Sequence, residues 1–318
     1  MNRLMGYLRL MRPANIITAI TDILAGVAIA GSMISITYYG GAPGTSLGRL
    51  FLANLSTDLI PSILWLILST VGLYGGGVVL NDVFDAALDK KERPERPISS
   101  GLIPKKHAAI FGIILLVTGV AAAALSSQDG IFSLSAQLAA GIAIASVCYD
   151  KWTKHSSFFG PLNMGLCRAL NLLLGMSLMP FAVGLYWLVA IIPMVYIVAV
   201  TMISRGEVHG GKKTTLYAAM VLYLFVILTI VLASYQRSTV YNTMPIVLIF
   251  IILIFPSLVY AIQKPEGTRV RTAVKSGVIA LIAMNSAWAA AFGDIYFALL
   301  ILLLFPLSLL LSRLFAVT

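Results

Sequence analysis

The sequence predicts an all-α bundle of membrane-spanning helices. The chain has 318 residues, of which 59% are hydrophobic and only 11% are charged, and its mean hydropathy is +0.96. A soluble core cannot bury that much apolar surface, so lipid must surround most of the chain. The apolar runs are long and do not alternate with polar residues, which favours helices over the strands of a membrane barrel.

Nine spanning helices are expected, or ten if the last apolar stretch forms two. The N-terminus, MNRLMGYLRLMRP, is basic and precedes an apolar run of full spanning length, which indicates a first membrane helix rather than a signal peptide. A ninth helix begins near Ser276, and a break at Gly293 and Asp294 leaves room for a tenth up to Ser312. The chain, 1–318, is expected to form one membrane domain. The first eight spans are expected at 14–34, 61–84, 107–126, 133–149, 163–183, 185–203, 215–234 and 244–262.

Basic residues gather in alternate loops between these spans. Cytoplasmic loops retain Lys and Arg, so the N-terminus and the basic loops are expected to face the cytoplasm of a cell inner membrane. The net charge of +10 therefore reflects topology, and no nucleic-acid partner is expected. The opposite loops carry only Arg49 and Arg237, whereas the basic loops carry Lys90, Lys91, Arg93, Arg96, Lys105, Lys106, Lys151, Lys154, Arg168, Arg205, Lys212, Lys213, Lys264, Arg269, Arg271 and Lys275.

An acidic motif, NDVFDAALD, ends the second predicted helix at residues 81–89. Asn81, Asp85 and Asp89 follow at intervals of four, and each step of four turns a helix by only about 40°, so the three share one face. Asp82 lies about 100° from Asn81 and is a weaker candidate for the site. Carboxylate and amide oxygens suit Mg²⁺, which proteins usually hold together with substrate phosphates.

The next segment, KKERPERPISSG, adds two arginines to the acidic face. Arg93 and Arg96 each precede a proline, so both are expected on extended backbone just beyond the helix. Guanidinium groups bind phosphate oxygens in pairs, and metal ligands followed by arginines would hold a diphosphate. The alternative is a set of solvated surface ion pairs of small energetic value, and spacing alone leaves both interpretations open.

These two segments together resemble the first aspartate-rich motif of the UbiA superfamily of intramembrane prenyltransferases. RPANIITAITDILAG at 12–26 is similar to the opening helix of that family, and YDKWTKHSSFFGPLNMGLCRALNLLLG at 149–175 is similar to its central loop and fifth helix. The resemblance implies about nine helices around a central cavity, with Mg²⁺ and the diphosphate of a prenyl diphosphate bound at the cytoplasmic side. It also implies an apolar tunnel for the isoprenyl tail.

The resemblance assigns roles to residues position by position. Asn81, Asp85 and Asp89 would be the first metal-binding set, and Tyr149 would lie near the reacting carbon, so that Asp85, Asp89 and Tyr149 are the expected catalytic residues. Arg168 has an alternative role as an arginine that reaches toward lipid headgroups. The residues implied to bind diphosphate are Arg93, Arg96 and Lys154, and those implied to line the cavity are Asn15, Asn163, Arg168 and Asn171.

The sequence departs from the family at the second aspartate-rich motif, roughly D-x-x-x-D followed by a lysine. Here the segment is TMISRGEVHGGKKTT at 201–215, and Ser204 stands where the first aspartate is expected. Glu207 and His209 are the available replacements. Glu207 could hold a second Mg²⁺, with Arg205 and Lys212 on the phosphates, or the loop could simply cap its helix. This departure resembles the divergent EboC-like branch found in some bacterial biosynthetic gene clusters.

The expected function is Mg²⁺-dependent transfer of an isoprenyl group from a prenyl diphosphate to a small aromatic or alcohol acceptor, with membrane lipid around the protein. A membrane terpene cyclase on the same fold is one alternative, and a non-catalytic lipid-binding or transport protein is another. Charges crowd one face of the membrane apart from Asp22, which favours an enzyme over a transporter. Asp22 itself either pairs with a polar residue or lies near enough to the surface to be hydrated.

Overall fold

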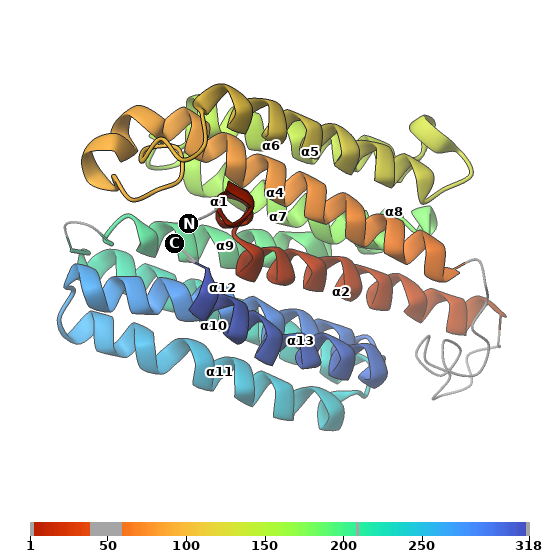
Figure 1. Cartoon of the computed structure of the whole chain (residues 1–318). Coiled ribbons are helices and arrows are strands. Elements are labelled where there is room, and N and C mark those ends of the chain that lie inside the picture. Colours follow the sequence, from red (N-terminus) through yellow and green to blue (C-terminus); the bar gives the residue numbers. More distant parts are fainter. Residues whose placement is uncertain (1–2, 39–58, 208–209, 316–318) are drawn as a thin grey trace.

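The computed structural model describes residues 3–38, 59–207 and 210–315, and these are almost entirely helical, without strands. The predicted all-α class is therefore confirmed (Figure 1). Three short turns, η1 (Gly130–Phe132), η2 (Tyr149–Thr153) and η3 (Trp187–Ala190), connect longer elements. The α-helices are α1 (Arg3–Met11), α2 (Pro13–Tyr38), α4 (Leu59–Glu92), α5 (Lys105–Leu125), α6 (Leu134–Cys148), α7 (Phe159–Met176), α8 (Pro180–Tyr186), α9 (Ile191–Ser204), α10 (Lys213–Gln236), α11 (Val240–Gln263), α12 (Gly267–Ala291) and α13 (Ile295–Leu314).

Among the described residues, eight helical segments are long and apolar enough to cross a membrane, when α8 to α9 are counted as one. The 15-residue α6 and the 18-residue α7 run alongside them (Figure 1). The chain breaks between α12 and α13 at Gly293, whose φ is +91°. Asp294 then caps α13, because its carboxylate accepts the Phe297 N–H at 3.0 Å. Eight of the ten predicted segments therefore qualify as membrane spans among the described residues, and the full number of passes stays a prediction.

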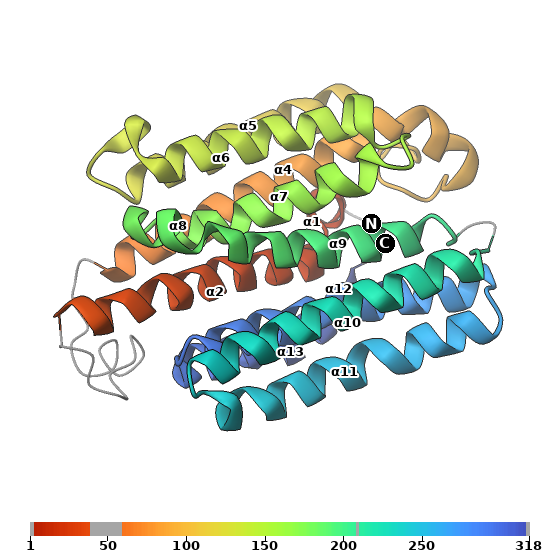
Figure 2. The same cartoon turned by 180° about the vertical axis from the view of Figure 1, so that it is seen from behind.

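Helix α2 occupies the centre of the bundle, between a layer with α4 and α7 and a layer with α12 and α13 (Figures 1 and 2). Its backbone approaches α7 closely at two glycines. A Cβ atom on Gly26 would lie 2.4 Å from the Leu172 carbonyl oxygen, and one on Gly175 would lie 2.4 Å from the Ile23 carbonyl oxygen. Small residues allow such close packing of membrane helices, and they fix α2 against α7 here.

The short helix α1 meets α2 at a sharp break. Arg12 has φ +50°, a left-handed conformation that is uncommon for residues other than glycine. Pro13 follows as the first residue of α2, where its missing N–H is not needed. Leu10 of α1 packs with Val79, Val83 and Ile103, so α1 is anchored against α4 and the chain that follows it.

One end of the bundle carries the segments that the sequence analysis singled out. The turns at 93–104, 149–158, 205–207, 210–212 and 264–266 all lie at this end, on the left in Figure 1, and α1 lies beside them. We refer to it as the basic end, since most of the Lys and Arg residues belong to these turns and the adjoining helix termini. The fold therefore brings the acidic end of α4, η2 and the start of α2 to one place.

Candidate active site at the basic end

The acidic end of α4 is held in a cluster of charged side chains that we call the polar cluster: Arg12, Asp82, Asp85, Asp89, Arg96 and Lys154. Asp82 and Asp89 are both buried, at 5% and 6% exposure. Arg96 joins them, because its Nη1 donates to Asp89 Oδ2 at 2.7 Å and to Asp82 Oδ1 at 3.2 Å. Asp82 and Asp89 are seven residues apart, which is about two helical turns, so both side chains lie on the side of α4 that faces Arg96.

Arg12 binds the same cluster from the break between α1 and α2. Its Nη2 donates to Asp82 Oδ1 at 3.1 Å across 70 residues of sequence. Asp82, predicted to be a weaker candidate for the site, therefore lies in the same charged cluster as Asp89, and its part in a metal site stays untested. The prediction assumed that the site meets one face of α4, whereas cations approach that helix from two sides: Arg12 and Arg96 contact Asp82, and Lys154 contacts Asp85.

Lys154 forms an ion pair with Asp85, and it follows directly after η2. The chain after Lys154 is fixed by two further contacts. Asn163 Nδ2 donates to the Thr153 hydroxyl at 3.0 Å, and the Arg205 guanidinium donates to the Ser156 carbonyl. Arg205, at the end of α9, is thus hydrogen-bonded to the turn between η2 and α7.

Tyr149 and Asp150 open η2, a five-residue π-helical turn directly after α6. Asp150 is 4% exposed, and its Oδ2 has no hydrogen-bond partner among the described residues. Burial raises the pKa of Asp150 to about 8, an effect that nearby Lys154 opposes and Asp85 and Asp82 reinforce. Burial, with the adjacent Asp150 carboxyl, also raises the pKa of Tyr149 to about 12, so its phenol is neutral at neutral pH.

A second set of polar residues, which we call the buried network, lies deeper among α2, α4, α7 and α12. Arg168 Nε lies 2.7 Å from Asp22 Oδ2, and both side chains are almost fully buried. Asn171 donates to Asp22 Oδ2 at 2.9 Å, and Asn285 donates to Asp22 Oδ1 at 2.7 Å. Thr18, Thr21 and Thr70 complete the network through hydrogen bonds to Arg168, Asn285 and Asn171 respectively.

This network decides two alternatives left open by the sequence. Asp22 is fully buried and pairs with Arg168, so it is not hydrated near a surface. Arg168 is only 7% exposed and points to Asp22, so it does not reach for lipid headgroups. Asn171 joins the same network, and Asn15 is buried on α2, two residues after Pro13.

The profile of the UbiA prenyltransferase family matches residues 42–265 of this chain, which include the end of α4, η2 and α7. The chain belongs to the UbiA prenyltransferase family. The family and the enzyme class predicted from the sequence, a prenyltransferase, are confirmed. Assignment to the EboC-like branch stays a prediction.

Relatives of this UbiA-family chain include two enzymes named digeranylgeranylglyceryl phosphate synthase. The enzyme from Saccharolobus solfataricus is 27% identical over 302 residues, which cover 88% of this chain and 96% of the relative. The enzyme from Methanococcoides burtonii is 32% identical over 169 residues, and the match spans about half of its length, 53%.

Solved structures of UbiA-family proteins share the fold. A structure from work on digeranylgeranylglyceryl phosphate synthase has a TM-score of 0.61 at 20% identity, with 92% of this chain and 99% of the other covered. A UbiA homolog from Archaeoglobus fulgidus bound to DMAPP and Mg²⁺ has a TM-score of 0.57 at 15% identity, with 87% and 99% covered. At these identities the likeness shows the fold alone.

The altered second motif of this UbiA-family chain lies close to arginines. Glu207 is buried, its pKa is raised by burial, and Arg93, Arg271 and Arg12 oppose that rise. Ser204 donates its hydroxyl to the Thr201 carbonyl within α9. Lys212 is exposed just before α10, and His209 lies outside the described residues. Whether Glu207 binds a metal stays a prediction.

The donor set suits Mg²⁺ bound with a phosphorylated substrate better than an ion enclosed by protein alone. Among the described residues, no group of three or more His, Cys, Asp or Glu side chains could hold a metal. Mg²⁺ is usually bound by one or two carboxylates together with substrate phosphates. Asp85 and Asp89 supply two such carboxylates one turn apart on α4, and the partly buried Asn81 lies one turn before them.

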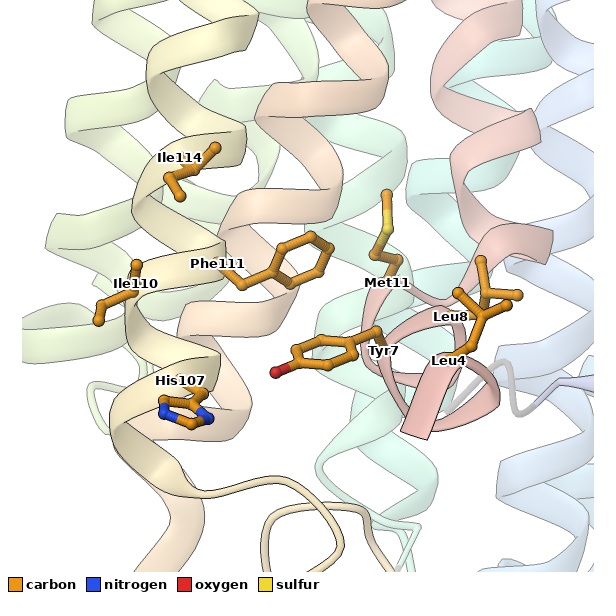
Figure 3. Close-up of a pocket in the computed structure, with 8 residues that line it drawn as sticks. All are labelled: Leu4, Tyr7, Leu8, Met11, His107, Ile110, Phe111 and Ile114. Atoms are coloured by element: carbon orange, nitrogen blue, oxygen red, sulfur yellow. The ribbon is translucent and has the colours of Figure 1, made fainter. Parts of the chain in front are cut away.

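A cavity of about 480 Å³ lies outside the polar cluster, between α1 and α5 (Figure 3). Tyr7 and Met11 of α1 line it opposite Phe111 of α5, and His107 lies at one end in the view of Figure 3. Tyr7 and Phe111 meet edge to face at 5.0 Å. This cavity is on the flank of α4, so the central cavity implied by the family resemblance stays a prediction.

Sequence reasoning missed residues in and beside both sets, including Thr18, Thr21 and Thr70 of the buried network. Arg12 and Asp82 belong to the polar cluster, Asp150 lies beside it, and Asn285 belongs to the buried network. Arg12 and Asp150 stood inside the two segments quoted for the family resemblance, so their position in the motif was an available signal. Asn285 lies within an apolar run, where a polar residue in a spanning helix indicates a buried partner.

Proposed function

We propose that this chain transfers an isoprenyl group from a prenyl diphosphate to a hydroxyl group on a glyceryl phosphate-type acceptor. The match across 96% of the S. solfataricus digeranylgeranylglyceryl phosphate synthase is the observation that supports these substrates. A product of that name carries two geranylgeranyl groups on glyceryl phosphate, so one step of its assembly joins a geranylgeranyl group to a hydroxyl oxygen. Of the two predicted acceptor classes, the proposal takes the alcohol rather than the small aromatic.

The diphosphate of the donor would bind at the polar cluster. Asp85 and Asp89, with Asn81, would hold Mg²⁺, which supplies positive charge to the departing diphosphate. Arg93, Arg96 and Lys154 would bind phosphate oxygens. Arg96 and Lys154 are 15% and 11% exposed, so an arriving diphosphate can draw them away from the carboxylates that they now neutralise.

Positive charge that is already in place stabilises the diphosphate as its bond to carbon breaks. The polar cluster provides this charge through Arg12, Arg96 and Lys154, each anchored on an aspartate. The allylic cation that forms needs shelter from water and an electron-rich neighbour. Tyr149 is proposed to present its neutral ring to that cation, since an aromatic face attracts positive charge.

The basic end is proposed to face the cytoplasm, in the cell inner membrane, as the distribution of Lys and Arg predicts. Labelling of single cysteines introduced on opposite ends, for example at Ser157 and at Gln128, tests this in intact cells. A membrane-impermeant maleimide should label the Gln128→Cys protein first, after Cys148 and Cys167 have been replaced. Preferential labelling of the Ser157→Cys protein would reverse the orientation.

Incubation of the purified protein with Mg²⁺, geranylgeranyl diphosphate and geranylgeranylglyceryl phosphate tests the reaction. The expected products are inorganic diphosphate and a glyceryl phosphate with two geranylgeranyl ethers, identified by mass spectrometry. Shorter and longer prenyl diphosphates define the donor. A cyclic hydrocarbon formed without acceptor would instead support a terpene cyclase, and absence of diphosphate release with every donor would support a non-catalytic role.

Asp85→Asn is the informative variant, and Asp129→Asn is its matched control. Asp129 is an exposed aspartate in the turn at the opposite end of the bundle. Asp85→Asn should reduce Mg²⁺-dependent diphosphate release by about a thousandfold, because an amide lacks the charge that attracts the ion. Asp129→Asn should leave it unchanged. Equal activity of the two variants would reject the assignment of Asp85.

A further inference from the structure

Asp150 is a buried carboxyl group that the proposed reaction has not yet used. Its side chain is 4% exposed, and its Oδ2 has no hydrogen-bond partner among the described residues. Buried polar atoms in folded proteins are nearly always hydrogen-bonded, because leaving one unpaired is unfavourable. The unpaired Oδ2 of Asp150 can therefore accept a hydrogen bond from a substrate that binds beside it.

The backbone around Asp150 is also unusual. α6 ends at Cys148, and the chain continues as the π-helical turn η2 before the Lys154 N–H bonds to the Tyr149 carbonyl at 3.0 Å. Such a turn contains one more residue than an α-helical turn and is frequent at functional sites. η2 packs on α4, α6 and α7, so Asp150 lies between the helix of the acidic motif and the fifth predicted span.

Charged and titratable groups face Asp150 from each of the neighbouring elements. Asp82 and Asp85 face it from α4, Arg12 from the start of α2, and Cys167 from α7, while Tyr149 and Lys154 flank it on its own segment. The cations lower its pKa and the carboxylates raise it, but burial dominates, and the resulting pKa of about 8 lies close to a working pH. A general base is most effective when its pKa lies there.

Asp150 stands apart from the proposed metal ligands. It lies on η2 rather than on the acidic face of α4, although Asp82 and Asp85 influence it electrostatically. Tyr149 is also unsuited to accept a proton from an alcohol and pass it on, since its phenol is already protonated at neutral pH. Of the four aspartates Asp82, Asp85, Asp89 and Asp150, only Asp150 has no cation contact in the described hydrogen bonds and ion pairs.

We propose that Asp150 is the general base that accepts the proton of the acceptor's hydroxyl group during prenyl transfer. This inference rests on the proposed function. The bond between the allylic carbon and the diphosphate oxygen breaks, and its electron pair leaves with inorganic diphosphate. A lone pair of the acceptor oxygen forms the new carbon–oxygen bond, and the hydroxyl proton moves to the Asp150 carboxylate. Asp150 is then a catalytic residue for the second half of the reaction alone.

The variant Asp150→Asn separates that second half from the first. An amide has the shape of the carboxyl group but cannot accept the proton at neutral pH. Transfer to geranylgeranylglyceryl phosphate should fall roughly 10²- to 10⁴-fold, the range of general base catalysis. Diphosphate release in the presence of Mg²⁺ should fall less than tenfold, because water captures the cation, and geranylgeraniol should replace the ether as the main product.

A thiol acceptor provides a readout that a purely structural role would not change. A thiol has a pKa near that of free cysteine, about 8.5, so it forms its anion without help from the protein. With the thiol analogue of geranylgeranylglyceryl phosphate, Asp150→Asn should transfer within about tenfold of the unsubstituted protein. Asp150→Glu, which keeps a carboxyl group, should retain more ether formation than Asp150→Asn with the natural hydroxyl.

The unsubstituted protein offers a test that does not depend on folding of a variant. As the pH falls from 9 to 6, Asp150 becomes protonated, so the ratio of ether to geranylgeraniol should fall while diphosphate release continues. The ratio should not depend on pH in Asp150→Asn. Asp129→Asn should follow the unsubstituted protein throughout.

The outcomes separate the two hypotheses. If the unsubstituted protein forms no ether and releases no diphosphate, the proposed function fails, and the role of Asp150 fails with it. If it forms ether, an unchanged ether-to-alcohol ratio in Asp150→Asn overturns the role of Asp150 alone. An equal loss of diphosphate release and ether formation also overturns that role, since Asp150 would then act on donor ionisation. The role of Asp150 is supported if Asp150→Asn lowers the ether-to-alcohol ratio with the hydroxyl acceptor and still transfers efficiently to the thiol acceptor.

Discussion

The polar cluster and the buried network use the same residue types in opposite ways. Both place aspartates against guanidinium groups inside an apolar bundle. In the buried network, Asp22 receives Arg168 and Asn171 on one oxygen and Asn285 on the other, and its side chain is 0% exposed. In the polar cluster, Arg96 is divided between two aspartates, and Lys154 pairs with Asp85, which is 22% exposed.

This difference separates a structural contact from a binding site. An almost fully buried ion pair whose carboxylate also accepts two amide hydrogen bonds has no favourable alternative partner, so it remains fixed. A partly exposed cation that shares its hydrogen bonds can move to a phosphate with little loss. We therefore expect substitutions in the buried network to act on stability and those in the polar cluster to act on substrate binding.

The largest expected effect is on stability, from Asp22→Ala. It leaves the Arg168 guanidinium buried without its counter-charge, and such a loss typically destabilises a protein by about 3–5 kcal/mol. The midpoint of thermal unfolding in detergent measures it, with Asp129→Ala as the control. Unchanged thermal stability would remove the distinction between the two regions.

Arg96→Gln should act mainly on substrate binding. Gln cannot bridge Asp82 and Asp89 or supply charge to a diphosphate, so KM for the prenyl diphosphate should rise about 100-fold, or about 2.7 kcal/mol. Thermal stability should change by less than in Asp22→Ala. Steady-state kinetics and thermal unfolding of the same preparation decide this, and a large stability loss with normal KM would contradict it.

Asp150→Asn should change how stability depends on pH. The pKa of Asp150 is raised to about 8 in the folded protein, so the folded state holds a proton that the unfolded state releases between about pH 4 and pH 8. Stability therefore falls as pH rises in that range, by up to about 1.4 kcal/mol per pH unit. Asp150→Asn lacks this slope, so its unfolding midpoint should exceed that of the unsubstituted protein more at pH 8 than at pH 6. Parallel midpoints would show that the carboxyl group ionises as if exposed.

Asp82→Asn should have the smallest effect. An amide oxygen can still accept from Arg12 and Arg96, so the geometry persists while one charge is lost. Turnover with saturating donor should fall about three- to tenfold, or about 0.7–1.4 kcal/mol. A loss as large as that of Asp85→Asn would instead make Asp82 a metal ligand.

The fold was largely predictable because long apolar runs and their breaks are local signals. Gly293 and Asp294 mark the last break, and the structure uses one for its positive φ and the other as a helix cap. The count of nine or ten was ambiguous for a physical reason: α6 has only 15 residues, and α12 and α13 are separated by a single short turn.

The site was only partly predictable, because its contacts join residues distant in sequence. Spacing on one helix identified Asp85 and Asp89, and prolines identified the segment of Arg96. No spacing rule connects Arg12 with Asp82, which are 70 residues apart, and a left-handed φ at a non-glycine residue cannot be deduced from its identity. Asp150 was overlooked because its environment depends on the π-helical turn that buries it.

The partners of Asp22 are far along the chain, and this has a consequence for biosynthesis. Asn171 follows Asp22 by 149 residues and Asn285 follows it by 263. A ribosome that adds about 5–20 residues per second therefore produces Asn285 at least about ten seconds after Asp22. Until Arg168 is made, the first helix carries a carboxyl group without its counter-charge toward the bilayer, and until Asn285 is made that group lacks one of its hydrogen bonds. The buried network around Asp22 is therefore complete only when α12 has been made, near the end of translation.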